Sequence, residues 1–123
     1  MDKIRFLIVD DHPTFSKGLA RMLEDEEDFE CVGQASNGVE AINLARKLKP
    51  DIALIDVSMP KMSGIQAAKE IRKHCPKTSV IMLSAFDYEA YVLTSLRAGA
   101  RGYILKTTPL EKLTRITRFG SPP

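Results

Sequence analysis

Several features that would define a protein class are scarce in this sequence of 123 residues. It has no tryptophan and only two cysteines, Cys31 and Cys75, which form neither a CxxC pair nor a cluster with histidine. This spacing argues against a zinc–thiolate site. We therefore expect both cysteines to behave as small apolar residues without a disulfide.

No charge of one sign dominates, and no apolar run is long. The formal net charge is +2, which gives no reason to expect a nucleic-acid or membrane surface. The first apolar run, Ile4 to Val9, is too short for a signal peptide or a membrane span. We therefore expect a cytoplasmic protein of one domain that does not bind nucleic acid directly and does not enter a membrane.

Two kinds of apolar pattern alternate along the chain. Short runs rich in β-branched residues predict strands, and segments with apolar residues at helical spacing predict helices. The predicted helices begin at Pro13, after Asn37, and after the capping residues Ser63 and Asp87; the fourth ends at Gly99. A fifth helix carries Leu110, Leu113 and Ile116 and is expected to be short. The predicted strands cover residues 4–9, 29–35, 52–55, 79–83 and 102–105.

Five strands that alternate with five helices predict an α/β fold, with a parallel sheet covered by helices on both faces. We expect the domain to occupy residues 1–118. Residues 119–123 end in Gly-Ser-Pro-Pro, which predicts a loose tail. No effector domain is expected within this chain.

Polar residues stand where four of the predicted strands end. Asp10 and Asp11 follow the first strand, Asp56 the third, Ser84 the fourth and Lys106 the fifth. Ligand sites in such sheets lie beyond the carboxyl ends of the strands. Each residue alone is commonly a cap or a solvated group, so the prediction of a shared site depends on their occurring together.

This set of side chains suits phosphoryl transfer. Three crowded carboxylates repel one another unless a cation intervenes, and Mg²⁺ prefers oxygen ligands. The metal and Lys106 would neutralise phosphoryl oxygens, one of the carboxylates would be the nucleophile, and Ser84 would donate a hydrogen bond.

The chain resembles the receiver domains of bacterial two-component response regulators over residues 3 to about 116. The resemblance is carried by four motifs. The branch with a LuxR-type helix-turn-helix output domain is most similar in three segments: Asp10-Asp11-His12-Pro13, Val57-Ser58-Met59-Pro60 and Leu83-Ser84-Ala85. The motifs are Val9-Asp10-Asp11-His12; residues 50–56 followed by Met59-Pro60 and Gly64; Leu83-Ser84-Ala85; and residues 102–106.

The resemblance implies a flavodoxin-like, doubly wound sheet with strand order 2-1-3-4-5 and a role for each site residue. Asp56 would accept a phosphoryl group from a histidine kinase. Asp10, Asp11, Asp56 and the main-chain carbonyl of Ser58 would hold Mg²⁺. Lys106 would pair with Asp56 or its phosphoryl group. Ser84 and Tyr103 would form a conformational switch that controls an output, which in this branch is transcription through a DNA-binding domain. A homodimer is compatible with the sequence.

Two departures from the family pattern stand near the end of the chain. Thr107 replaces the proline that often follows the lysine, and a cis bond before a non-proline residue is costly. The fifth helix also usually runs longer. His12 stands beside the acidic pair and could contact the site, but a polar cap at the start of the first helix is the preferred interpretation. His74 is interpreted as a surface residue.

Three other functions were weighed. A magnesium-dependent phosphatase with an aspartyl nucleophile usually needs an acid at the position of Ser58. A flavodoxin-like cofactor binder would need a phosphate-cradling loop where Asp10 and Asp11 would repel phosphate. A dimer module without chemistry would not need the complete set of acidic, hydroxyl and lysine side chains.

Overall fold

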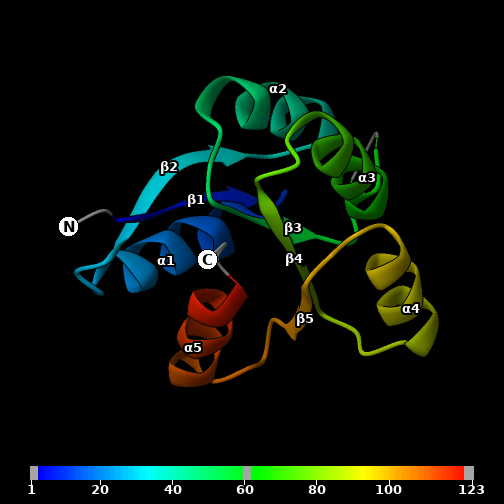
Figure 1. The fold of residues 1–123 in the computed structure, drawn as a ribbon. Helices are drawn as coiled ribbons and strands as arrows, with labels where there is room; N and C mark the ends of the chain where they lie inside the picture. Colours follow the sequence, from blue (N-terminus) through cyan, green and yellow to red (C-terminus); the bar gives the residue numbers. More distant parts are fainter. Residues whose placement is uncertain (1–2, 60–61, 121–123) are drawn as a thin grey trace.

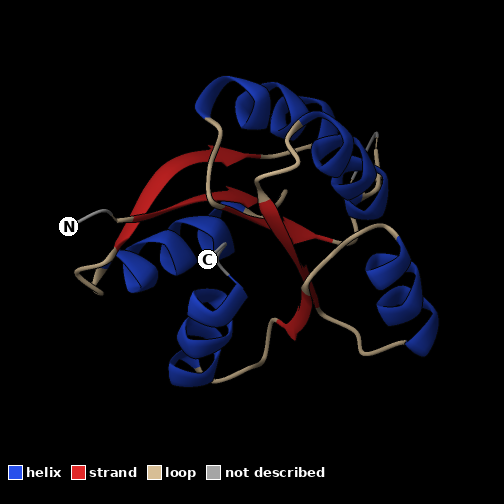
Figure 2. Cartoon of the chain, viewed as in Figure 1, coloured by secondary structure: helices blue, strands red, loops and turns tan. Residues whose placement is uncertain are grey.

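The computed structural model describes residues 3–59 and 62–120, in which strands and helices alternate throughout. Figure 1 shows a central sheet between two layers of helices, and Figure 2 separates the helices from the strands by colour. The elements are β1 (Ile4–Val9), α1 (Pro13–Glu24), β2 (Phe29–Ala35), α2 (Gly38–Leu48), β3 (Ile52–Asp56), α3 (Gly64–His74), β4 (Ser79–Ser84), α4 (Glu89–Arg97), β5 (Gly102–Leu105) and α5 (Leu110–Gly120).

All strand pairs are parallel, and the order across the sheet is β2-β1-β3-β4-β5. This confirms the predicted flavodoxin-like topology. The register pairs Val9 with Ile55, Asp56 with Leu83 and Ser84 with Leu105. The carboxyl ends of the four strands that carry the candidate site are therefore neighbours.

The sheet has a separate apolar layer on each face because successive strand residues point to opposite sides. Phe6 and Ile8 pack with α1 and α5 on one face, whereas Leu7 and Val9 pack with α2 and α3 on the other. Every residue of β3 and β4 is buried. These strands read as almost continuous apolar runs because helices cover both sides of them.

Most predicted helix boundaries are confirmed. Pro13 begins α1, where its missing N–H has no partner to lose. Asn37 caps α2 through a hydrogen bond from the main-chain N–H of Glu40, and Ser63 forms a reciprocal capping box with Gln66 at the start of α3. Gly99 has φ 101°, a left-handed conformation that glycine adopts without strain.

The prediction that Asp87 caps the fourth helix is wrong. Helix α4 begins at Glu89 after Tyr88, which makes no side-chain capping bond. The Tyr88 ring stacks on Phe86, with ring centroids 5.0 Å apart and planes 4° apart. Asp87 lies in the loop between the two stacked rings, one residue outside the N-cap position and too early to cap the first turn.

Helix α5 has 11 residues, as many as α2 and α3, and reaches Gly120. The predicted tail at residues 119–123 therefore begins too early. Gly120 lies so close to Ile81 that a Cβ atom there would be 2.5 Å from Ile81 Cδ1, which explains how a glycine fits the last helical turn. The rest of the predicted tail, residues 121–123, lies outside the described residues, as does Pro60 of the Met-Pro motif.

Two further findings concern the described ranges 3–59 and 62–120. No helix in them has both the length and the apolar character needed to cross a membrane. Their peptide bonds are all trans, including the bond between Lys106 and Thr107 that the sequence left open.

Gly64 allows α3 to start directly beneath the site. Its main-chain N–H donates to the carbonyl of Val57 at 2.9 Å. A Cβ atom at position 64 would overlap the main-chain carbonyl oxygen of Asp56. The absence of a side chain is therefore what lets the helix approach the strand end that carries Asp56.

We expect Gly64→Ala to lower the free energy of unfolding by at least about 2 kcal/mol, because main chain rather than a flexible side chain must move. Gly18→Ala is the matched control, since nothing lies within 4 Å of a Cβ atom there. In the middle of α1 it should add about 0.5–1 kcal/mol. Urea unfolding of both variants measures the difference, and equal stability would contradict the close approach.

Candidate functional site

The predicted site residues converge at the carboxyl edge of the sheet. Asp10 follows β1, Asp56 and Ser84 end β3 and β4, and Lys106 follows β5. The main-chain N–H of Lys106 donates to the carbonyl of Ser84 at 2.8 Å, which extends the strand pairing into the site. Asp10, Asp56 and Ser84 are 1–3% exposed. The sheet register thus holds the polar groups in a position shielded from water.

Lys106 joins two of the buried carboxyl groups. Its Nζ lies 2.7 Å from Asp10 Oδ2 and 3.2 Å from Asp56 Oδ2, and only 15% of its side chain is exposed. The ammonium also lies 4.6 Å from the centre of the Phe15 ring, a favourable cation–π contact. The predicted pairing of Lys106 with Asp56 is present in the structure.

For each residue of this ion pair, burial and ion pairing shift the pKa in opposite directions. Burial raises the pKa of Asp56 above its ordinary value, and the ammonium of Lys106 offsets only part of that rise. Burial alone would lower the pKa of Lys106, but its hydrogen bond to Asp10 and the charges of Asp56 and Asp10 raise it. Lys106 therefore stays charged, while the ionised form of Asp56 lacks some of the stabilisation that water would give.

The acidic groups have room for one more cation. Asp11 Oδ1 is buried and has no hydrogen-bond partner among the described residues. One ligand atom from each of Asp10, Asp11, His12 and Asp56 lies within 4.8 Å of the others. A hard dication that prefers oxygen ligands suits a buried carboxylate oxygen that accepts no hydrogen bond and lies among like charges, so the three aspartates fit Mg²⁺.

Ser58 orients the phosphoacceptor candidate through its main chain. Its N–H donates to Asp56 Oδ1 at 3.3 Å, and the residue is exposed. Asp56 therefore has one oxygen directed to the main chain of the following loop and the other to Lys106.

Ser84 and Tyr103 both bond to the main chain of Phe86. The Phe86 N–H donates to Ser84 Oγ at 3.0 Å, and the Tyr103 hydroxyl donates to the Phe86 carbonyl at 2.7 Å. Burial raises the pKa of Tyr103 above its ordinary value. The two predicted switch residues are therefore joined through one residue of the loop between β4 and α4.

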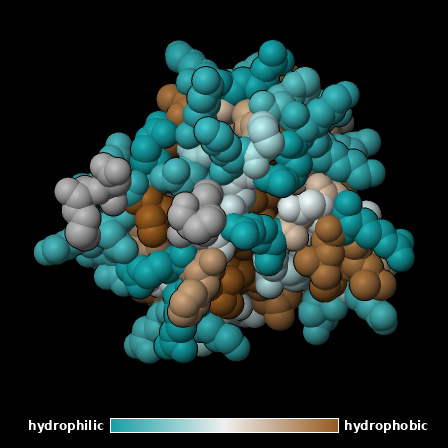
Figure 3. Space-filling view, viewed as in Figure 1, coloured by the Kyte–Doolittle hydropathy of each residue, from teal (hydrophilic) through white to brown (hydrophobic). Residues whose placement is uncertain are grey.

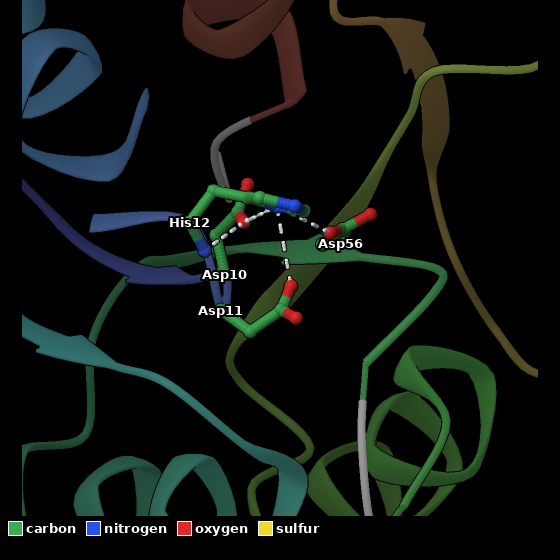
Figure 4. A group of neighbouring side chains, drawn as sticks. All are labelled: Asp10, Asp11, His12 and Asp56. Carbon is green, nitrogen blue, oxygen red and sulfur yellow. Dashed lines mark hydrogen bonds and ion pairs between the residues drawn. The ribbon is translucent and has the colours of Figure 1, made fainter. Parts of the chain in front are cut away.

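His12 lies at the site, which the sequence offered as the less favoured alternative to a helix cap. It does stand at the N-cap of α1, but its side chain makes no capping bond. Figure 4 shows the ring turned toward the three aspartates. Nδ1 lies 3.0 Å from Asp10 Oδ1 and 3.2 Å from Asp11 Oδ1. The signal in the sequence was the adjacency of His12 to the acidic pair, which also suits a simple cap.

The other predictions outside the site agree with the structure. His74 is exposed and lies 3.3 Å from Glu70. Cys31 and Cys75 are free thiols.

A hollow of about 580 Å³ lies at the opposite edge of the sheet and contains none of the candidate site residues. Two of its basic side chains, Arg46 and Lys49, are at or just after the end of α2, where cations complement the helix dipole.

Comparison with known proteins identifies the class. The family model for the response regulator receiver domain matches residues 6–118. The chain therefore belongs to the response regulator receiver domain family, as its motifs predicted.

Individual relatives are consistent with this assignment. The uncharacterized transcriptional regulatory protein YxjL of Bacillus subtilis is 44% identical over 91% of this chain and 51% of its own length. The signal receiver domain of the putative response regulator NarL from Mycobacterium tuberculosis is 34% identical, covers 97% of this chain and 96% of its own, and has a TM-score of 0.92. These matches confirm the predicted branch of transcriptional regulators. The chain spans about half the length of the curated relatives it matches.

A third match is the structure of a response regulator from Burkholderia pseudomallei with a phosphorylated aspartic acid, a calcium ion and citrate. It is 27% identical with a TM-score of 0.85, and the match covers 94% of this chain and 66% of that one.

We expect Asp56→Asn to raise the free energy of unfolding at neutral pH in buffer without divalent ions. Because burial raises the pKa of Asp56 above its ordinary 3.8, the folded state binds this proton more tightly than the unfolded chain does. Stability of the wild type is therefore lost as the pH rises from 3.8 through the raised pKa, whereas the amide has no such loss.

Urea unfolding at a series of pH values measures this difference, which should grow from acid to neutral pH. Asp87→Asn, which removes an exposed carboxyl outside the site, is the control for the loss of one negative charge. A less stable Asp56→Asn variant at neutral pH would mean that the ion pair with Lys106 outweighs the cost of burial.

Proposed function

We propose that this receiver domain accepts a phosphoryl group on Asp56 from the phosphohistidine of a histidine kinase. The observation that carries the proposal is the contact of one ammonium group, that of Lys106, with two buried carboxylates beside the carboxylate of Asp11. Family membership and the phosphorylated aspartic acid in the Burkholderia relative support it.

In the proposed reaction, an oxygen of Asp56 attacks phosphorus while the bond from phosphorus to the donor nitrogen breaks. The donor nitrogen keeps the bonding electron pair, and the product is an acyl phosphate. Lys106 stabilises the negative charge of the phosphoryl oxygens, and Ser84 donates a hydrogen bond to one of them. The protein is thus a signalling switch that promotes its own phosphorylation and dephosphorylation.

Asp10, Asp11, Asp56 and the main-chain carbonyl of Ser58 would hold Mg²⁺. The bound ion supplies charge neutralisation for the carboxylates and the phosphoryl oxygens. Asp11 is well suited to this role because its buried Oδ1 accepts no hydrogen bond among the described residues and lies 3.2 Å from His12 Nδ1. The calcium ion in the Burkholderia relative is also a hard dication that prefers oxygen ligands.

Phosphorylation should change the contacts of Phe86. A phosphoryl group brings about −1.5 to −2 charges and three acceptor oxygens, which draw Ser84 toward Asp56. The Phe86 N–H then loses its acceptor, and the loop that also bonds Tyr103 is released. The Tyr103 ring can then turn into the space beside β4.

The switch lies beside an exposed apolar surface. Phe86, Tyr88, Leu93 and Leu96 are 44–53% exposed. Figure 3 shows apolar side chains gathered over this part of the molecule. We propose that rearrangement here controls transcription through a DNA-binding domain outside residues 1–118, as suits a relative of transcriptional regulatory proteins about twice this length. A homodimer and a cytoplasmic location remain predictions from the sequence.

Phosphorylation is tested with acetyl phosphate and Mg²⁺, followed by intact mass spectrometry. We expect the wild type and Asp87→Asn to gain one phosphoryl group and Asp56→Asn to gain none. Removal of Mg²⁺ with a chelator should suppress the reaction. An inert wild type, or a modified Asp56→Asn variant, would contradict the role of Asp56.

The switch is tested separately with beryllium fluoride and Mg²⁺, which mimic a phosphoryl group on the acceptor. We expect the amide resonances of Ser84, Phe86 and Tyr103 to shift in the wild type and to stay unchanged in Asp56→Asn. If residues around Asp56 respond while Tyr103 does not, the site is supported and the switch is refuted.

A further inference from the structure

The fold does not use the imidazole of His12. Ser, Thr, Asn and Asp are preferred at an N-cap because their side chains accept a main-chain hydrogen bond, and His12 makes no such bond. Its side chain is 65% exposed, yet the ring is directed at three carboxyl groups instead of into water. The orientation of the His12 ring is therefore explained by the carboxyl groups of the site and not by capping of α1.

The separations between Nδ1 and the carboxylate oxygens match those between ligands of one ion. Around an octahedral ion with bonds of about 2.1 Å, adjacent ligands lie about 3.0 Å apart and opposite ligands about 4.2 Å apart. Nδ1 lies 3.0 Å from Asp10 Oδ1 and 3.2 Å from Asp11 Oδ1, as adjacent ligands would. It lies 4.0 Å from Asp56 Oδ2, close to the separation of opposite ligands.

We infer that His12 Nδ1 is a nitrogen ligand of the divalent-ion site, and that it gives the site a preference for Mn²⁺ and Co²⁺ over Mg²⁺. This inference rests on the proposed metal site at the aspartates and adds to it the identity of a further ligand. Imidazole is a good ligand for first-row transition metals, whereas Mg²⁺ strongly favours oxygen. The neutral ring, with its proton on Nε2, offers the lone pair of Nδ1.

The contact between His12 Nδ1 and Asp10 could instead be a hydrogen bond only, and this alternative predicts the opposite effect of His12 on ion binding. If the ring only donates a hydrogen bond to Asp10 Oδ1, any bound ion has to displace it. His12 would then be a competitor of every divalent ion, and its removal would tighten the binding of all of them. The effect of one substitution on several ions therefore separates a ligand from a competitor.

The experiment compares the wild-type chain with His12→Ala, using Mn²⁺, Co²⁺ and Mg²⁺ alone as probes. His74→Ala is the matched control, because it removes the other histidine from an exposed position at the end of α3. Binding is followed by electron paramagnetic resonance for Mn²⁺, by absorption for Co²⁺ and by competition for Mg²⁺.

We expect His12→Ala to weaken Mn²⁺ and Co²⁺ binding about tenfold or more and to change Mg²⁺ binding less than about threefold, within the range of losses seen when metal-site partners are removed. Pulsed resonance of bound Mn²⁺ should show coupling to an imidazole nitrogen in the wild type and in His74→Ala, and none in His12→Ala. Folding of each variant is verified by urea unfolding.

Three outcomes would overturn the role of His12 as a ligand. The His12→Ala variant could bind all three ions more weakly by the same factor, or it could bind all three more tightly. The third outcome is the absence of nitrogen coupling in the wild type. In those cases Mg²⁺-dependent modification of Asp56 by acetyl phosphate would still stand. A wild type that binds no divalent ion would overturn the proposed metal site together with this inference.

Discussion

The charge balance at the carboxyl edge of the sheet is the constraint on which the rest of the structure depends. Asp10 and Asp56 are 2% and 3% exposed, and Asp11 lies beside them. Only a nearby cation makes such a cluster tolerable, because burial penalises each ionised carboxyl and the carboxylates repel one another. Lys106 supplies that cation from β5, the edge strand. The compensation is incomplete, since the pKa of Asp56 stays raised. This residual imbalance is what the proposed divalent ion would relieve.

The sheet makes this arrangement possible because its register leaves little freedom. Both faces of β3 and β4 are buried, and a slip of one residue would exchange the two apolar layers. The same register places Asp56 beside Leu83 and Ser84 beside Leu105. The packing of apolar side chains thus fixes the positions of polar groups that would otherwise repel one another. Stability of the core and geometry of the site have a common origin.

The sequence was sufficient to predict the fold and the positions of most site residues, because both follow from the spacing of apolar residues along the chain. Strand ends are readable where an apolar run stops, and parallel strands bring those ends together. This is why Asp10, Asp56, Ser84 and Lys106 were all placed correctly. The errors occurred where local sequence leaves two conformations open. Asp87 has the chemistry of a cap, but the helix starts two residues later, after a loop in which Phe86 stacks on Tyr88.

His12 illustrates the same limit within the site. Its position at the start of α1 was readable, but the direction of its ring was not, because that direction depends on carboxyl groups contributed by a distant strand as well as by its neighbours. The helix start was predicted from residues close in sequence, whereas the ring responds to the assembled charge cluster. Side-chain directions at the surface of a sheet edge are therefore less predictable than the strand ends themselves.

Asp10 connects the two halves of the site. Its Oδ2 contacts Lys106, the cation proposed to neutralise the phosphoryl oxygens, and its Oδ1 accepts the main-chain N–H of His12 at 2.8 Å, which fixes the loop carrying the acidic pair. A change in charge on Asp56 therefore affects Lys106 directly and, through Asp10, the loop beside the proposed metal ligands. Phosphoryl acceptance and metal binding are thus expected to be coupled in this domain, because one buried carboxylate contacts both.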